Sequence, residues 1–268
     1  MALYTYLGLT AALSYTITCG LLMRQFFTDR PLNRQLFFIA GFLSLLFHGA
    51  SCLYAIQQAE GYLFNLLNAL SLSFFLSSLF LYALTLKEPL ENLGMIMFPM
   101  ATLAVIATVV LAPPENSKII HSPSILIHIL LALSSNAMIT LASLQSGMLA
   151  IGHYQLKRKS AMGFFQKFPP LDTMEHILFQ LIWAGVIFLS LGIATGFLFY
   201  ENLFLQHLSH KTFFTLCAWV IFVILLIGRH IFGWRGLQAV RWTNWGFLIL
   251  LLGFVGSGIV LEFILKKT

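Results

Sequence analysis

Residues 36–56 read LFFIAGFLSLLFHGASCLYAI and contain no aspartate, glutamate, lysine or arginine. At a rise of about 1.5 Å per residue, a helix of roughly 20 residues crosses the hydrocarbon core of a bilayer, which is about 30 Å thick. A stretch of this length and apolarity predicts a transmembrane helix. It also carries one histidine, His48.

The same kind of stretch recurs along the whole chain. With 59% hydrophobic and 9% charged residues among 268, the sequence has too few polar groups to coat a soluble globule. The windows long enough to span a membrane are 3–23, 36–56, 62–86, 93–112, 124–150, 175–200, 212–232 and 243–265. We therefore predict an all-α integral membrane protein with eight transmembrane helices, forming a single polytopic domain over residues 1–268.

Basic residues are distributed unequally between the connections of these windows. The connections after the first, third, fifth and seventh windows hold most of the fifteen lysines and arginines. The other side has Lys118, Lys211, Lys266 and Lys267. The positive-inside rule then places both termini on the outer, periplasmic side of a bacterial inner membrane. Because the net charge of +6 reflects this topology, no nucleic-acid partner is expected.

The longest polar segment, 153–172, joins the fifth and sixth windows on the side predicted to be cytoplasmic. Its run Lys157-Arg158-Lys159 fits a topology determinant, and it could also contact anionic lipid head groups or a partner protein. At the end of the segment, Asp172 and Glu175 have the spacing of a capping box that opens the next helix. None of these features requires a catalytic role.

Two histidines, His48 and His128, lie inside apolar windows and are the best sequence clue to function. An imidazole in hydrocarbon is unfavourable unless it is hydrogen-bonded or bound to a ligand, so each histidine marks a candidate site. His48 lies about 12 Å, and His128 about 6 Å, from the predicted outer boundary. Both rings could therefore reach one site in the outer leaflet, where the natural partner is a heme iron.

Small and weakly polar residues share a helical face with each histidine. The face of His48 carries Gly41, Ser44, Ser51, Cys52 and Ala55, and the face of His128 carries Ser124, Ala132 and Ser135. Such stripes fit either close helix packing or room for a flat ligand. In the third window, Asn65, Asn68 and Ser71 could orient a ligand histidine or carry heme propionates, and interhelical hydrogen bonding is the alternative.

Three further histidines are secondary candidates for cofactor binding. His207 and His210 lie in the connection between the sixth and seventh windows, on the predicted outer side. They are reserve ligands or solvated loop residues, and they share a helical face if the seventh helix begins early. His230 falls near the inner end of the seventh window, where it could belong to a separate inner site.

The three cysteines, Cys19, Cys52 and Cys217, are isolated and lie within apolar windows. They form no CxxC pair for thiol exchange and no CxxCH site for covalent heme attachment. A heme would then be b-type, held non-covalently by axial ligands and an apolar pocket. We expect no catalytic residues and no enzymatic activity, because the protein would bind and present the heme without breaking bonds.

Three tryptophans follow the seventh window beside basic residues. Trp234, Trp242 and Trp245 accompany Arg235 and Arg241. An indole has one polar edge and an apolar face, so this pattern is typical of an aromatic belt at a membrane interface. A cofactor role is not needed to explain it.

The order of several short segments is similar to that of a known family. The segments are Phe47-His48-Gly49-Ala50, Leu67-Asn68-Ala69-Leu70-Ser71-Leu72, Ile127-His128-Ile129, Pro169-Pro170-Leu171 and Gly233-Trp234-Arg235-Gly236. Together with the eight windows, they resemble the YpjD and HemX group of the CcsA and CcmC cytochrome c assembly superfamily. The resemblance covers nearly the whole chain and implies a heme-handling protein of the inner membrane.

The resemblance also implies roles for two histidines. In members of the CcsA type, heme lies at the outer surface between histidines that flank a tryptophan-rich segment, which presents it to apocytochrome c. His128 resembles the first of these histidines, and His230 approximately matches a histidine that precedes the Gly-Trp motif. The corresponding outer connection, 200–211, contains no tryptophan, which departs from the family pattern.

Three functions are compatible with these predictions. The first is a heme-binding protein that assists cytochrome c or heme-protein assembly by holding or handing over heme near the outer face, in contact with lipid and a partner protein. The second is a membrane regulator acting through cytoplasmic loops, as HemX-like, tetrapyrrole-linked relatives imply. The third, a transporter or intramembrane enzyme, is disfavoured because no acidic residue lies centrally in a window.

Overall fold

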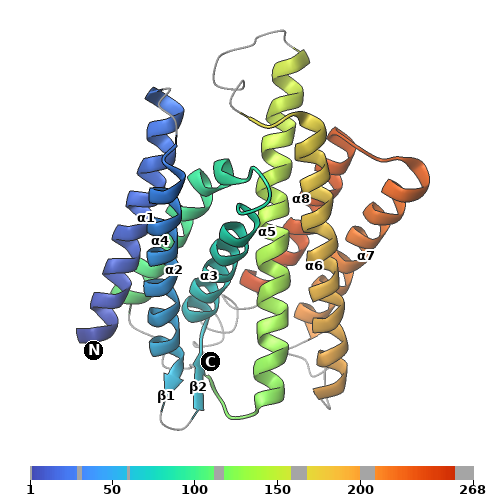
Figure 1. Cartoon of the computed structure of the whole chain (residues 1–268). Coiled ribbons are helices and arrows are strands. Elements are labelled where there is room, and N and C mark those ends of the chain that lie inside the picture. Colours follow the sequence, from blue (N-terminus) through green and yellow to red (C-terminus); the bar gives the residue numbers. More distant parts are fainter. Residues whose placement is uncertain are drawn as a thin grey trace. The chain divides into compact units, whose positions relative to one another are not determined.

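In the computed structural model, helices dominate the chain (Figure 1). The structure describes residues 2–28, 32–58, 61–111, 118–157, 168–199 and 209–256. Within these ranges, eight helices are long and apolar enough to cross a membrane, one for each predicted window. The helices are α1 Ala2–Thr28, α2 Arg34–Ile56, α3 Leu66–Leu84, α4 Gly94–Val110, α5 Pro123–Lys157, α6 Leu171–Phe199, α7 Ser209–Phe232 and α8 Leu237–Leu251. The eight helical spans are confirmed, whereas the side on which the termini lie stays a prediction.

The longest helix, α5, extends beyond its predicted window of 124–150. It has 35 residues and ends at Lys157. At about 1.5 Å per residue it is roughly 52 Å long, which exceeds the ~30 Å hydrocarbon core. At least one end of α5 therefore projects past the core, and the cation of Lys157 lies where it interacts favourably with the helix dipole.

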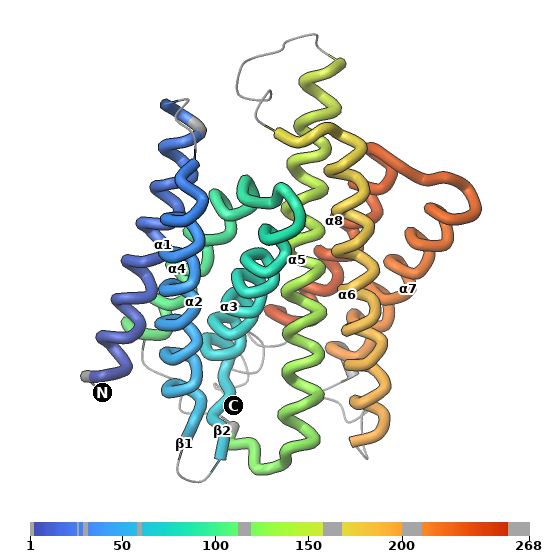
Figure 2. Tube along the Cα trace, in the orientation of Figure 1, coloured from blue at the N-terminus to red at the C-terminus, as the bar shows by residue number. Residues whose placement is uncertain are grey.

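The chain divides into two compact units, Met1–His121 with α1–α4 and Ser122–Thr268 with α5–α8. Figure 2 traces the first unit from blue to green and the second from green to red. In the first unit, α1 packs against α2 and α4, and α3 packs against the same two helices. In the second unit, α5 and α7 each pack against α6 and α8. Each unit is thus a four-helix arrangement, and a single domain over 1–268 stays a prediction.

The interior of the first unit contains a cluster of aromatic rings. Tyr15, Phe37 and Phe98 are each at most 2% exposed. The Phe98 ring stacks on Tyr15 with 5.6 Å between centroids and lies 6.4 Å from Phe37. Because lipid tails are as apolar as these rings, packing and hydrogen bonds rather than hydrophobicity hold such helices together. The cluster places the Tyr15 hydroxyl inside the unit.

A small antiparallel sheet, which the sequence did not predict, follows α2. Its strands are β1 Gln57–Gln58, β2 Gly61–Phe64 and β3 Lys118–Ile120, in the order β1-β2-β3. The prediction that the third helix begins at residue 62 is therefore wrong, since α3 begins at Leu66. The physical reason is Asn65, whose side chain accepts a hydrogen bond from the Asn68 N–H at 2.8 Å and caps the helix there.

Small residues bring α5 and α6 together in the second unit. A Cβ added at Gly192 on α6 would lie 3.7 Å from the backbone nitrogen of Ala132 on α5. The Ser135 hydroxyl on α5 donates to the carbonyl oxygen of Gly185 on α6 at 3.0 Å. Close backbone approach and hydroxyl-to-carbonyl bonds are typical of helix pairs in membranes. This approach sets the surroundings of His128, which faces the same helix.

Candidate functional site

His48 on α2 is fully buried in the first unit, with 0% of its surface exposed. Its Nδ1 lies 3.1 Å from the Tyr15 hydroxyl on α1, and its Nε2 lies 3.1 Å from the Ser71 hydroxyl on α3. A neutral imidazole has one donor and one acceptor nitrogen, so the two hydroxyls satisfy both. His48 therefore connects three helices of this unit.

A small pocket lies next to this network. The side chains of Ser51, Cys52, Asn68, Ser71 and Thr108, from α2, α3 and α4, provide its polar lining. Ser71 belongs to both features, because its Oγ also lies 3.7 Å from the Cys52 sulfur. The structure thus brings two predicted site residues, His48 and Asn68, into one region through Ser71.

The surroundings of His48 do not fit a heme in the described arrangement. The neighbouring pocket has no room for a water-sized group. Ligation of iron by Nε2 would require that the contact with the Ser71 hydroxyl be given up. A ligand histidine usually has one nitrogen directed at the metal while the other is hydrogen-bonded. The assignment of His48 as a metal ligand consequently stays a prediction.

His128 lies near the start of α5 and is half-buried. Its Nδ1 is 3.2 Å from the Thr195 hydroxyl on α6. That hydroxyl lies 2.9 Å from the carbonyl oxygen of Leu191 and 3.0 Å from that of Gly192, so it donates its single proton to the backbone. The Thr195 oxygen can then accept from the Nδ1–H of His128, which leaves Nε2 as the nitrogen with a lone pair.

Gly196 allows the ring of His128 to lie against α6. A Cβ at this position would be 3.2 Å from the ring carbon Cε1, which is tighter than an ordinary contact. The ring is therefore held on one side by a hydroxyl and on another by bare backbone. Because hydrogen bonding at one imidazole nitrogen orients the other toward a metal, these surroundings fit an axial heme ligand.

The structure does not bring the predicted ligands into one set. His48 belongs to the first unit and His128 to the second, so their joint ligation stays a prediction. Within the described ranges, no group of three or more histidine, cysteine, aspartate or glutamate side chains could hold a metal ion. Cys19 and Cys52 are free and buried, whereas Cys217 is free and only partly buried.

For the other three candidate histidines, the structure shows no surroundings like those of His48 or His128. His207 lies outside the described residues, and His210 falls in the first turn of α7. His230, in the last turn of α7, is exposed. Its ring makes an edge contact with the indole of Trp183 on α6, at 6.1 Å between centroids. Their roles as cofactor ligands stay predictions.

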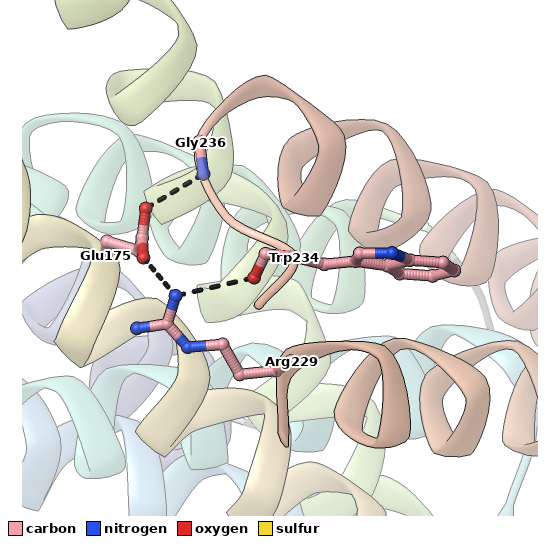
Figure 3. Close-up of polar contacts among 4 residues, drawn as sticks. All are labelled: Glu175, Arg229, Trp234 and Gly236. Atoms are coloured by element: carbon pink, nitrogen blue, oxygen red, sulfur yellow. Dashed lines mark hydrogen bonds and ion pairs between the residues drawn. The ribbon is translucent and has the colours of Figure 1, made fainter. Parts of the chain in front are cut away.

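A cluster that the sequence did not single out lies where α6 begins and α7 ends. The Arg229 guanidinium donates to Oε1 of Glu175, and the Gly236 N–H donates to Oε2 at 2.8 Å (Figure 3). Arg229 also reaches the carbonyl oxygen of Trp234 at 3.4 Å. We call these four residues the Glu175 clamp. They tie the connection between α7 and α8 to α6.

The Glu175 carboxylate binds Arg229 and Gly236 rather than acting in the capping box that its spacing from Asp172 suggested. These two residues lie 54 and 61 residues later in the chain, and no local spacing encodes such a contact. The sequence signal that could have indicated this ion pair is that Glu175 and Arg229 both lie at the predicted cytoplasmic ends of their helices. Ionisable groups near lipid pair with one another because an isolated charge there is unfavourable.

Comparison with known proteins finds one matching family and several relatives. Residues 36–265 match the Cytochrome C assembly protein family. Inner membrane protein YpjD of Escherichia coli strain K12 is 30% identical over 261 residues, which cover 96% of this chain and 98% of YpjD. Protein HemX of Brevibacillus brevis is 26% identical over 142 residues, which cover 52% of each chain.

A partial match is also found in Azospirillum brasilense. There, an uncharacterized 28.8 kDa protein in the nifR3-like 5' region is 28% identical over 141 residues, which cover 52% of each chain. No solved structure matches. The eight apolar helices and the near full-length similarity to an inner membrane protein identify a multi-pass protein of the inner membrane. The chain belongs to the cytochrome c assembly protein family.

Proposed function

We propose that this chain is a heme-binding protein of the inner membrane that assists the assembly of cytochrome c or other heme proteins. It holds b-type heme near the outer face and passes it to a partner protein, with no bond-breaking step of its own. The observation that carries the proposal is His128, a half-buried histidine anchored at Nδ1 by Thr195 in a chain of the cytochrome c assembly family.

The residues around His128 have distinct parts in this proposal. His128 Nε2 is the axial ligand, Thr195 fixes the tautomer and the ring direction, and Gly196 leaves space for the ring. Bound heme supplies an iron that accepts a nitrogen ligand and the porphyrin that an acceptor protein needs. The chain contains no CxxCH, so the heme stays non-covalent. Candidates for the second ligand are His207 and His210.

The proposal includes a topology with both termini outside. Eleven of the fifteen lysines and arginines lie in the connections after α1, α3, α5 and α7 or in the helix ends that border them, which favours a cytoplasmic position for these connections. The start of α5, with His128, then lies near the outer face. Alkaline phosphatase fused at the C-terminus should be active, and alkaline phosphatase fused within residues 158–167 should be inactive. The opposite pair of results would show that both termini lie in the cytoplasm.

The reduced-minus-oxidised absorbance spectrum of the detergent-solubilised protein tests heme binding. Protein from heme-replete cells should show b-type bands, and His128→Ala should lower heme occupancy at least tenfold because the axial ligand is gone. His121→Ala, at an exposed histidine, is the matched control and should keep the bands. A wild type without b-type bands, or full occupancy in His128→Ala, would contradict the proposal.

A membrane regulator is the second candidate function. The observation that favours it is the Glu175 clamp, because a fixed α7–α8 connection offers a constant surface to a partner. Pull-down from native membranes should recover a partner with wild type and with His128→Ala, and less of it with Glu175→Gln. Failure to recover any protein reproducibly would reject this candidate.

A further inference from the structure

Two arginines near the start of α8 have no acidic partner in the described part of the chain. Arg235 lies in the α7–α8 connection, two residues before the helix begins at Leu237, and Arg241 lies in the second turn of the helix. Both are exposed, and neither takes part in the ion pairs found among the described residues. Arg229, by contrast, is neutralised by Glu175. Among the described residues, neither of these two positive charges is compensated by an ion pair.

The Glu175 clamp holds the backbone on either side of Arg235. Gly233 and Gly236 have φ angles of 65° and 59°, which permit the sharp turn between α7 and α8. The Gly236 N–H is bound to the Glu175 carboxylate, and the Trp234 N–H donates to a carbonyl oxygen of α7 at 3.1 Å. An anchored backbone lowers the entropy lost when the Arg235 guanidinium binds a ligand.

Three aromatic rings lie beside the same turn. Trp234 stacks on Trp242 with 5.2 Å between centroids and on Phe232 with 6.3 Å. Figure 3 shows the Trp234 indole extending away from the Glu175 carboxylate. Phe232 is 70% exposed. Rings of this kind favour the head-group region of a bilayer, where one edge stays polar and the faces contact apolar chains.

The exposed face of α8 changes character along the helix. Its exposed residues, spaced three or four apart, are Gln238, Arg241, Trp245 and Leu248, and the exposed Leu252 continues the series in the π-helical turn Leu252–Gly256 that follows α8. The order runs from polar to basic to aromatic to aliphatic, which is what a helix shows when it enters a bilayer from the head-group layer. Arg241 therefore lies near the depth of the lipid phosphates.

We propose that Arg235, Arg241 and the stack of Phe232, Trp234 and Trp242 form a docking site for the phosphate head group of an anionic phospholipid. Charge complementarity carries the proposal, since a guanidinium binds phosphate oxygens in pairs and both arginines lack an acidic partner in the described chain. Beyond Arg241 the same face continues with the exposed Trp245 and then with exposed leucines, so the occupant is a lipid rather than a soluble phosphate.

The test uses the whole protein reconstituted in phosphatidylcholine vesicles with brominated lipids, which quench tryptophan fluorescence on contact. Brominated phosphatidylglycerol should quench more than brominated phosphatidylcholine, and added salt should reduce the difference. Each of Arg235→Gln and Arg241→Gln should lower the apparent affinity for phosphatidylglycerol about fivefold. Arg24→Gln, at an exposed arginine of α1, is the matched control and should change nothing.

Several outcomes would overturn the site. One is equal quenching by the two lipids in the wild type. The others are full selectivity for phosphatidylglycerol in the Arg235→Gln, Arg241→Gln double variant, and a loss of selectivity in Arg24→Gln as large as in the single variants. Loss of selectivity when inorganic phosphate replaces chloride at equal ionic strength would assign the site to a soluble anion. A double variant that loses heme but keeps lipid selectivity would assign the arginines to heme propionates. The Arg235→Lys, Arg241→Lys double variant keeps both positive charges and should retain part of the selectivity for phosphatidylglycerol. This result separates the loss of charge from misfolding.

Discussion

His48 and His128 have similar sequence surroundings, an imidazole in a stripe of small residues within an apolar helix, yet their environments in the two units differ. His48 is fully buried, and a hydroxyl lies next to each of its nitrogens. His128 is half-buried and rests against the bare backbone of Gly196, with Nδ1 held by Thr195. The first is part of a polar core network, and the second is the residue that we propose as a heme ligand.

The difference originates in the helices that pack against each histidine. The partners of His48, Tyr15 and Ser71, lie 33 and 23 residues away in the sequence. A buried group whose polar atoms are all hydrogen-bonded is satisfied by the protein itself. A stripe of small residues therefore identifies a buried histidine, but the neighbouring helix decides whether that histidine is structural or available to a cofactor.

The largest expected effect comes from replacing His48. His48→Leu leaves the hydroxyls of Tyr15 and Ser71 without their ring partner, at about 1 kcal/mol each, so the free energy of unfolding should fall by about 2 kcal/mol. Unfolding of the detergent-solubilised protein, followed by circular dichroism, measures the loss. The b-type heme spectrum should keep its normal intensity.

A double-mutant cycle sharpens this prediction. In a Tyr15→Phe, Ser71→Ala background the hydroxyls are gone, so His48→Leu should cost much less than in the native background. Loss of the heme spectrum from a folded His48→Leu protein would make His48 a ligand. It would also remove the distinction between the two histidines.

A smaller effect is expected from Gly196→Ala. The added Cβ would lie 3.2 Å from the His128 ring and displace it, so heme affinity should fall by about 1 kcal/mol, roughly fivefold. Gly192→Ala is the matched control, because its Cβ meets the nearest atom at an ordinary 3.7 Å. Heme titration followed by Soret absorbance compares them, and equal affinities would contradict the proposed role of Gly196.

The smallest effect is expected from Thr195→Val, which removes the hydroxyl that orients His128. Interhelical hydrogen bonds in membrane proteins contribute about 0.6 kcal/mol on average, so heme affinity should fall about threefold. Thr195→Ser keeps the hydroxyl and should keep the affinity. The same titration measures both variants, and a valine variant with native affinity would show that Thr195 does not position the ring.

Much of the fold could be predicted from the sequence. The thickness of the hydrocarbon core sets the length of a spanning helix, so windows of apolar residues locate the eight described helices to within a few residues at most ends. The sheet of β1, β2 and β3 was missed because its strands are two to four residues long and pair residues as far apart as Tyr62 and Ile120. No periodic pattern can develop over such short segments.

The candidate site was predictable in part. The sequence identified His48 and His128 because an imidazole is rare in an apolar window, and Asn68 because an amide there needs a partner. It named Ser71, with Asn65 and Asn68, as a side chain that could orient a histidine, and Ser71 does contact His48. It did not identify Tyr15 or Thr195 as partners. Hydroxyl residues are frequent in these helices, and many of them bond to the backbone of their own helix.

By itself, then, the sequence determined that the chain spans the membrane eight times and that two histidines lie inside its helices. Only the tertiary structure decided that His48 is enclosed by hydroxyls, that His128 rests on a glycine, and that Glu175 binds Arg229. The physical reason is that periodicity along one helix specifies which face is buried, whereas the groups that meet this face come from other helices.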